Sequence, residues 1–576
     1  MHNPPTLERR ASRGVAGKIF TRVVCGVLLA AFAAGAWAQQ PGLPPLIDRQ
    51  LFFGDPEIIN AQLSPDGKFI AFIKPLDGTR NVWVKRTEEP FEAARPVTAD
   101  TKRPIPGYFW SEDGKFILFV QDQAGDENYN VYAVDPAASP AAGQRVPAAH
   151  NLTEAKGARA FIYAVPETDP DTIYVGLNDR DPAWHDLYKV KISTGERTLV
   201  RKNTERLTGW VFDLKDQLRL ATRSAENGDT EVLRVDADGF KKVYSCGVFE
   251  TCYPVQFHKD GRRVYMVTNK GDVDLTRLVL FDPGTGREEL VEADPMNRVD
   301  FGSPLFSDRT DELIATLYFD DKMRIYFKDK DFEADYELLQ KRLPGKELRV
   351  GSGTEDERLF LISAVSDTEP GETYLFDRTS KKATLQYRIR EKLPREHLAE
   401  MKAIRYKSSD GLEIPAYLTL PKGVPARNLP LVVVPHGGPW GRDTWGYGSL
   451  SQFLANRGYA VLQPNFRAST GYGKKFLNAG NDEWGQKMQD DKDDGVKWLI
   501  AQGIAAPDRV AMHGYSYGGY AAFAAGVRPN GLYQCAIAGA GVAELASFQR
   551  DTFENRFIRE FQNPTIKGLN PLSKAA

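Results

Sequence analysis

The nine residues Met512–Tyr520, MHGYSYGGY, have the composition and spacing of a serine nucleophile held in a tight turn. Ser516 has one glycine two positions before it and another two positions after it, and an apolar run precedes the motif. A strand, a sharp turn and a helix in this order raise a serine hydroxyl above a sheet. The backbone N–H of Tyr517 then points to where an oxyanion would form. Serine at a helix start is often only a cap, but the two glycines and the apolar run favour a nucleophile.

A serine nucleophile needs a base, usually a histidine that a carboxylate orients. The chain has seven histidines, and none follows Ser516. In α/β-hydrolases the acid and then the histidine follow the serine along the chain, and here only one aspartate, Asp551, does so. The apolar strand predicted at 535–541 would also be left as an exposed sheet edge. We therefore expect the triad acid and base to lie beyond Ala576 and the 576-residue, C-terminally truncated chain to be almost inert.

A second glycine turn, HGGP at 436–439, follows the apolar run LPLVVVP. A Gly-Gly turn leaves backbone N–H groups free to serve as the second oxyanion donor. The base is not expected to be His436, because the turn after it calls for backbone chemistry. His513 is expected to be a packed residue of the strand that leads to Ser516.

Residues 393–576 alternate between strand and helix patterns. After a strand-like segment at 406–423, the fully apolar run at 429–435 predicts a strand buried on both faces. Another buried strand is predicted at 459–466, and further strands are predicted at 509–514 and 535–541. Helices are predicted at 449–458, 491–503 and 516–529. This order indicates a doubly wound, mostly parallel sheet, here an α/β-hydrolase domain that is incomplete at its C-terminus.

Residues 55–392 repeat a hairpin unit. LSPDGKFIAFI (63–73) and FWSEDGKFILFV (109–120) are near copies with an Asp-Gly turn between alternating apolar positions, which is hairpin chemistry. Weaker copies begin near residues 170, 214, 257, 309 and 355. Short strands repeating at this spacing predict a seven-bladed β-propeller. An array of β-sandwiches would also space strands evenly, but the repeated D-G-K-F-I favours the propeller.

The N-terminus has the layout of a secretory signal peptide, with basic residues, an apolar stretch at 23–34 and the cleavage motif Ala36-Trp37-Ala38. We expect cleavage after Ala38, a short N-terminal segment at 39–54, and an exported, periplasmic or extracellular protein. The alternative is an uncleaved anchor. No later apolar run is long enough for a membrane span, and the net charge of −2 gives no electrostatic case for nucleic acid.

Export would place the cysteines in an oxidising compartment. Cys246 and Cys252 are then expected to form a disulfide, the alternative being two free, buried thiols. Cys535 begins an apolar strand and is expected in the core. No metal site or cofactor is expected, because no second Cys or His pair has ligand spacing.

Two charged segments invite functional interpretations. The acidic run Asp490, Asp491, Asp493 and Asp494 could bind a cation, but lysines are interleaved with it, so we expect a solvated helix face. In the segment 178–186, Asp179 or Asp181 could hold a substrate amino group; a simple charged loop is the plainer interpretation.

Three segments resemble the prolyl oligopeptidase family of serine peptidases: HGGPWGR, QPNFRASTGYGKKF (463–476) and HGYSYGGY. The segment 46–73 is similar to the propeller entry of acylaminoacyl-peptidase-like and dipeptidyl-peptidase-like members. The resemblance implies a propeller over an α/β-hydrolase domain, with Ser516 as nucleophile and Tyr517 and Gly438 as oxyanion donors. Many relatives have a tyrosine where His436 stands, so that tyrosine's contribution is not expected here.

The function that this resemblance implies is hydrolysis of short peptides near their N-terminus, through an acyl-enzyme on Ser516. Two other functions stay open. A catalytically silent peptide-binding protein would have no need of the elbow, and a carboxylesterase would have little use for a propeller over its site.

Overall fold

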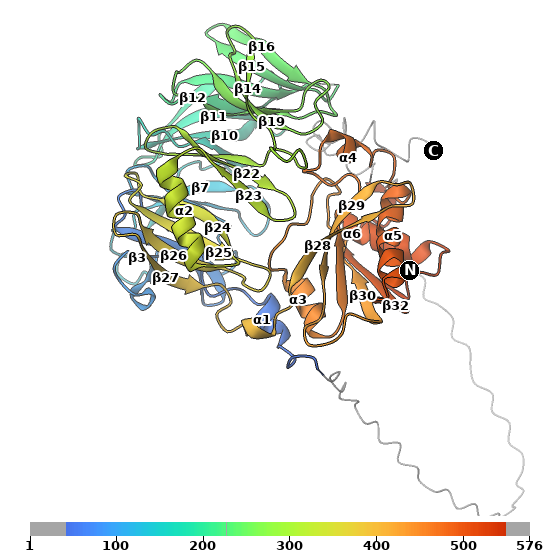
Figure 1. Cartoon of the computed structure of the whole chain (residues 1–576). Coiled ribbons are helices and arrows are strands. Elements are labelled where there is room, and N and C mark those ends of the chain that lie inside the picture. The colour runs from blue at the N-terminus through green and yellow to red at the C-terminus, as the bar shows by residue number, and fades with distance from the viewer. Residues whose placement is uncertain (1–41, 226, 546, 549–576) are drawn as a thin grey trace, which may run out of the picture. The chain divides into compact units, whose positions relative to one another are not determined.

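The computed structural model describes residues 42–225, 227–545 and 547–548. The predicted signal peptide, 1–38, and Asp551 lie outside the described residues. Within them, seven small antiparallel sheets precede one six-stranded sheet (Figure 1). The predicted seven-bladed propeller followed by an α/β-hydrolase domain is therefore confirmed.

The blades follow one another along the chain, and within each sheet neighbouring strands are consecutive. The first four sheets contain β1 (Ile59–Leu63), β2 (Phe69–Leu76), β3 (Thr79–Arg86) and β4 (Arg95–Pro96); β5 (Tyr108–Trp110), β6 (Ile117–Gln121), β7 (Asn130–Val134) and β8 (Ala149–Asn151); β9 (Ala160–Ala164), β10 (Thr172–Asp181), β11 (Trp184–Lys191) and β12 (Arg197–Arg201); and β13 (Leu207–Phe212), β14 (Leu218–Ser224), β15 (Thr230–Asp236) and β16 (Gly239–Cys246). The other three contain β17 (Cys252–Phe257), β18 (Val264–Thr268), β19 (Arg277–Phe281) and β20 (Glu288–Glu292); β21 (Ser303–Phe306), β22 (Leu313–Phe319) and β23 (Met323–Phe327); and β24 (Glu347–Gly353), β25 (Leu359–Val365), β26 (Glu372–Asp377) and β27 (Lys382–Arg388).

The repeated sequence unit is a repeated turn. In the first blade the Ser64 hydroxyl donates to Asp66 and accepts from the Phe69 N–H, while Gly67 has a φ of 70°. The second blade repeats this between Ser111 and Asp113. These turns are short because a side-chain hydroxyl closes them and glycine tolerates the left-handed backbone.

The sixth blade departs from the pattern. It has three strands, and helix α2 (Lys330–Arg342) stands where the other blades have a fourth. Asp329 caps this helix by accepting from the Phe332 N–H at 2.7 Å. Phe332 and Leu339 pack into an apolar cluster that includes Leu348 of β24, so the helix fills the space between the last two blades.

The hydrolase sheet has the order β28-β29-β31-β30-β32-β33, and from β31 to β33 its strands are parallel. Its strands are β28 (Met401–Lys407), β29 (Glu413–Thr419), β30 (Leu429–Val433), β31 (Ala460–Pro464), β32 (Ala505–Tyr515) and β33 (Cys535–Gly539). The helices of this part are α3 (Ser449–Asn456), α4 (Lys474–Asn478), α5 (Lys487–Ala501) and α6 (Tyr517–Val527), and α1 (Arg49–Phe53) and the short 3₁₀ turns η1 (Phe91–Ala93) and η2 (Arg395–His397) lie earlier.

The cysteine predictions have opposite outcomes. Cys246 and Cys252 form a disulfide between the end of β16 and the start of β17, which confirms the expected bridge. The expectation that Cys535 is a core residue is wrong, because its side chain is exposed. Among the described residues only β32 flanks β33, so one edge of that strand is left uncovered.

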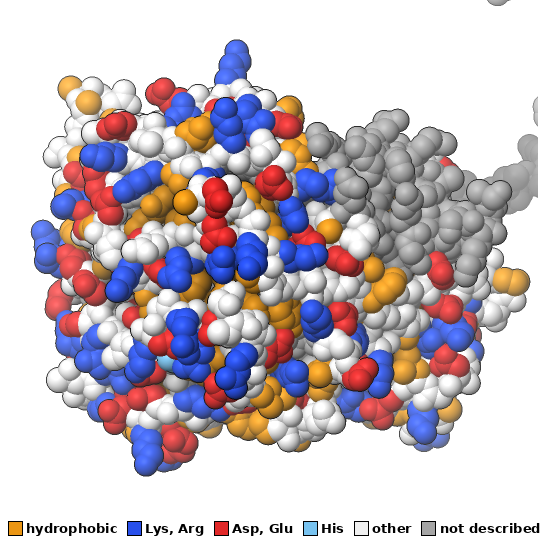
Figure 2. All heavy atoms as spheres, turned by 90° about the horizontal axis from the view of Figure 1, so that it is seen from above, with side chains coloured by type: hydrophobic (Ala, Val, Ile, Leu, Met, Phe, Trp, Pro, Cys, Tyr) orange, Lys and Arg blue, Asp and Glu red, His pale blue; other side chains and the backbone are white. Residues whose placement is uncertain are grey.

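The surface carries mixed charge. On the face shown in Figure 2, Lys and Arg side chains are interspersed with Asp and Glu, with apolar side chains between them. No helix of the described residues is long and apolar enough to cross a membrane.

Candidate active site

Ser516 occupies a strained turn between β32 and α6. Its φ of 58° and ψ of −121° lie outside the usual regions for a residue with a side chain. The main chain holds it there, because the Ser516 N–H donates to the Gly539 carbonyl at 3.0 Å and its carbonyl accepts from the Tyr520 N–H at 3.1 Å. Strain of this kind is found where function requires a fixed side chain.

Crowding explains the glycines of the motif. A Cβ atom on Gly514 would overlap the Gly518 carbonyl, and one on Gly518 would overlap the Pro435 carbonyl. One on Gly519 would lie 2.7 Å from the Gly539 oxygen. The backbones of the elbow, of β33 and of the segment before HGGP therefore meet without side chains between them.

The Ser516 hydroxyl is available for chemistry. The residue is exposed and its side chain does not cap α6. Among the described residues, its hydroxyl makes no hydrogen bond. The turn at 436–439 lies beside it, since a Cβ atom on Gly437 would be 3.4 Å from Ser516 Cβ and 3.9 Å from Oγ. Gly437 is thus the glycine that contacts Ser516, and Gly438 follows it with a φ of 121°.

His436 faces away from the nucleophile. Its Nε2 lies 2.8 Å from Ser469 Oγ and its Nδ1 lies 2.8 Å from the Gly437 carbonyl. The ring stacks on Phe466 with centroids 4.4 Å apart. Burial lowers the pKa of His436 to about 4, so its imidazole is neutral at ordinary pH. In this arrangement His436 supports the glycine turn.

The other candidate residues lie elsewhere. His513 is within β32, and its Nδ1 is buried without a hydrogen-bond partner in the described part of the chain. Asp181 ends β10, where its carboxylate accepts from the Ala183 N–H, and Asp179 is exposed in the same strand.

The prediction of a solvated acidic face on α5 is wrong. Of the acidic run, Asp491, Asp493 and Asp494 are buried, as is Lys492, and Asp490 is partly exposed, with a side-chain exposure of 37%. Arg467, from the segment after β31, binds Asp491 at 2.7 and 2.8 Å. Arg528, at the end of α6, pairs with Asp493 at 2.8 Å, and Ser409 binds Asp494. Partners from distant parts of the chain satisfy these carboxylates, so they do not need solvent.

An aromatic layer beneath the site was not expected from the sequence. Tyr517 is buried, and its ring lies 5.3 Å from Phe466 and 4.7 Å from Trp484. The ammonium group of Lys492 lies 3.6 Å from the Phe466 ring centroid. The run NFR (465–467) supplies Phe466 to this layer, and this apolar residue shortly after the predicted strand is the signal in the sequence.

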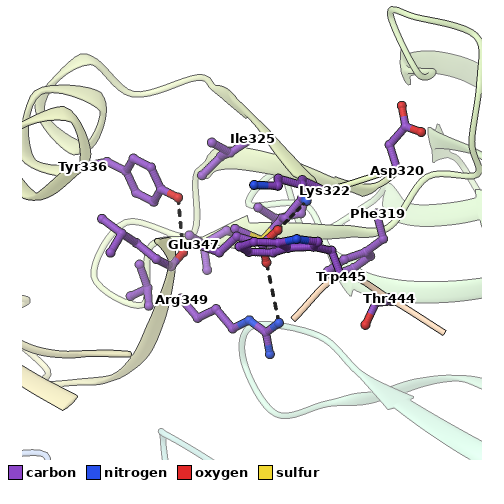
Figure 3. Close-up of a pocket in the computed structure, with 14 residues that line it drawn as sticks. Phe319, Asp320, Lys322, Ile325, Tyr336, Glu347, Arg349, Thr444 and Trp445 are labelled. Carbon is purple, nitrogen blue, oxygen red and sulfur yellow. Dashed lines mark hydrogen bonds and ion pairs between the residues drawn. The ribbon is translucent and has the colours of Figure 1, made fainter. Parts of the chain in front are cut away.

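Of the cavities along the contact between propeller and hydrolase segments, two are lined in part by Thr444. One of about 330 Å³ is lined by strands of the last two blades and by Trp445, which follows the HGGP turn (Figure 3). The Lys322 ammonium group lies 3.7 Å from the Trp445 ring centroid there. The other, of about 570 Å³, is lined by Tyr253 and Asp300 of the propeller and by Arg442 and other hydrolase residues.

A β-propeller joined to an α/β-hydrolase domain that holds an exposed serine in a strained elbow defines a propeller-containing serine hydrolase. The model of the Prolyl oligopeptidase family matches residues 445–575. The dipeptidyl aminopeptidase BIII of Pseudoxanthomonas mexicana is 38% identical over 504 residues, which cover 85% of this chain and 71% of that protein. Dipeptidyl peptidase family member 6 of Caenorhabditis elegans is 30% identical over 538 residues, covering 87% and 71%. The chain belongs to the prolyl oligopeptidase family and is a serine peptidase.

Solved structures share the fold at lower identity. A puromycin-hydrolyzing peptidase of Mycobacterium tuberculosis has a TM-score of 0.69 and 17% identity, covering 92% of this chain and 84% of that one. The acylaminoacyl peptidase of Pyrococcus horikoshii has a TM-score of 0.60 and 16% identity, covering 91% and 83%.

Proposed function

We propose that Ser516 attacks the carbonyl carbon of a peptide bond near the N-terminus of a short peptide. The attack forms an acyl-enzyme that water then hydrolyses. The observation that carries this is the exposed Ser516 hydroxyl, held at a left-handed backbone position beside Gly437. The Tyr517 and Gly438 N–H groups would bind the oxyanion of the tetrahedral intermediate.

A dipeptidyl-peptidase type of cleavage is favoured over an acylaminoacyl type. The support is the 38% identity to a dipeptidyl aminopeptidase, against 16% to an acylaminoacyl peptidase. The 570 Å³ cavity beside Arg442 is in the size range of small-ligand sites. We propose that it receives substrate residues next to the scissile bond.

We also propose that the protein is exported. The basic, apolar and small-residue regions of residues 1–38 support this. The disulfide between Cys246 and Cys252 gives independent support, because such bridges persist in oxidising compartments.

A panel of chromogenic substrates tests the proposed function. The assay uses protein expressed from its complete coding sequence. Dipeptidyl-anilides should be hydrolysed faster than acylaminoacyl-anilides and p-nitrophenyl esters. Faster turnover of the esters would instead make the protein an esterase, and binding of peptides without turnover would make it a silent binding protein.

A further inference from the structure

Lys492 is a buried cation that the serine mechanism does not account for. Its side chain is fully buried on α5, and no carboxylate of the described residues forms an ion pair with it. Its ammonium group donates to the Met488 carbonyl at 2.6 Å and, more weakly, to the Tyr517 hydroxyl at 3.5 Å. Burying a lysine without a carboxylate partner costs folding free energy, so its presence calls for a compensating role.

The surroundings of this ammonium group are aromatic. It lies 3.6 Å from the Phe466 ring centroid and 5.2 Å from that of Tyr517. Desolvated cation–π contacts of this kind are among the stronger ones. The ammonium group therefore holds two rings in place.

One of these rings is next to the HGGP turn, and the other is part of the elbow around Ser516. Phe466 stacks on His436, the first residue of the HGGP turn. Tyr517 directly follows Ser516, and its N–H is the proposed oxyanion donor. The Lys492 ammonium group thus contacts one ring next to each of the two backbone segments that meet at Ser516.

We propose that Lys492 is a positioning residue of the peptidase site: its ammonium group fixes Phe466 and Tyr517, and its positive charge favours the oxyanion that forms next to them. This rests on the proposed function of Ser516. A fixed charge in a dry interior acts on the transition state more strongly than one in water, and it needs no reorganisation during the reaction.

The charge of Lys492 depends on pH. Burial lowers its pKa to about 7. The charged groups around it are Asp491 and Asp493 on α5, which raise its pKa, and Arg467 and Arg528, which lower it; His436 faces it as a neutral ring. The ammonium form is present below that pKa and is lost as the pH rises through it. The proposed assistance therefore fades on the alkaline side.

The test compares Lys492→Met and Lys492→Gln with the wild type, all made from the complete coding sequence. Gln keeps a donor for the Met488 carbonyl, so it covers the case in which Met does not fold. Lys497→Met is the matched control, because Lys497 is on the same helix with its side chain 61% exposed. Thermal unfolding establishes that each variant is folded.

Both variants should lower kcat roughly 10- to 100-fold near pH 6 with little change in KM. The ratio of the wild-type kcat to the variant kcat should fall as the pH rises to about 9, since Lys492 itself is then neutral. Folded variants with wild-type kcat and an unchanged pH profile would overturn the proposal. An inactive wild type would instead reject the proposed function, so the two failures are distinguishable.

Discussion

Gly518 packs directly against the carbonyl oxygen of Pro435, with no room for a Cβ atom between them. Gly518 is in the first turn of α6, and Pro435 directly precedes the HGGP turn. The nucleophile elbow and the glycine turn are therefore in backbone contact. Peptidase activity should depend on keeping these backbones close.

Substitution of Gly518 by alanine tests this contact. The added methyl group must push α6 away from Pro435, so we expect a loss of about 1–3 kcal/mol in the free energy of unfolding and near-complete loss of activity. Gly526→Ala is the control, because a Cβ atom there would meet only Ala536 Cβ, at 3.6 Å. That variant should be neutral or up to about 1 kcal/mol more stable. Denaturant unfolding and anilide assays measure both effects; equal behaviour of the two variants would contradict the close contact.

The pair between Arg467 and Asp491 should be essential for stability. Asp491→Asn removes one of the two carboxylates that bind the buried Arg467 guanidinium, while Asp410 still binds it, so we expect a loss of about 1.5–3 kcal/mol in the free energy of unfolding. Asp508→Asn, at a position whose side chain is 84% exposed, should change stability by less than about 0.5 kcal/mol. Urea unfolding of the two variants measures the difference. A loss below about 1 kcal/mol in Asp491→Asn would mean that the pair is not buried as described.

Acid should weaken the propeller through Glu372. Burial raises the pKa of this carboxyl, but hydrogen bonds from Lys346, Tyr374 and Arg388 outweigh it and lower the pKa to about 2. Because the folded-state pKa lies below the ordinary value of 4.5, the stabilisation is complete above that value and is lost as the pH falls towards 2. Wild type should exceed Glu372→Gln in stability at neutral pH, and the gap should close in acid. A gap that stays constant with pH would contradict the shifted pKa.

The disulfide should make a modest contribution to the free energy of unfolding. Cys246 and Cys252 are six residues apart, and short loops lose little entropy on closure, so Cys246→Ala with Cys252→Ala should cost about 2 kcal/mol or less. Thiol titration of denatured, unreduced wild type should leave these two cysteines unreactive. Their reaction as free thiols would show that the bridge is absent in the purified protein.

Local sequence patterns predicted the fold well where an element depends only on contacts between residues that are close in sequence. The Asp-Gly turns at Asp66 and Asp113 close hairpins with their own neighbours, so counting them predicted the blades. The pattern after residue 393 predicted β29 to β33 of the hydrolase sheet, but β28 (Met401–Lys407) lies almost wholly before the strand-like segment predicted at 406–423. The sixth blade could not be predicted in this way, because α2 replaces a strand by packing onto β24 of the next blade.

The sequence predicted the part of the site that depends on backbone geometry, because that geometry requires glycine at particular positions. Gly514 must be glycine because of its contact with Gly518 within the elbow, and Gly518 because of its contact with the Pro435 carbonyl. The roles assigned to Tyr517 and Gly438 stay predictions. The prediction for α5 was wrong because the arginines that bind its carboxylates are distant in sequence. Arg467 is 24 residues from Asp491, and Arg528 is 35 residues from Asp493. The sequence of the helix alone does not reveal such partners.

The most direct test of the account compares the wild type with Ser516→Ala, both expressed from the complete coding sequence. The wild type should hydrolyse a dipeptidyl-anilide and should be labelled on Ser516 by a fluorophosphonate, as seen by peptide mass spectrometry. The variant should fold normally, resist labelling and lose roughly a million-fold in kcat. A variant that retains wild-type turnover, or a label found on another residue, would contradict the central claim that Ser516 is the nucleophile.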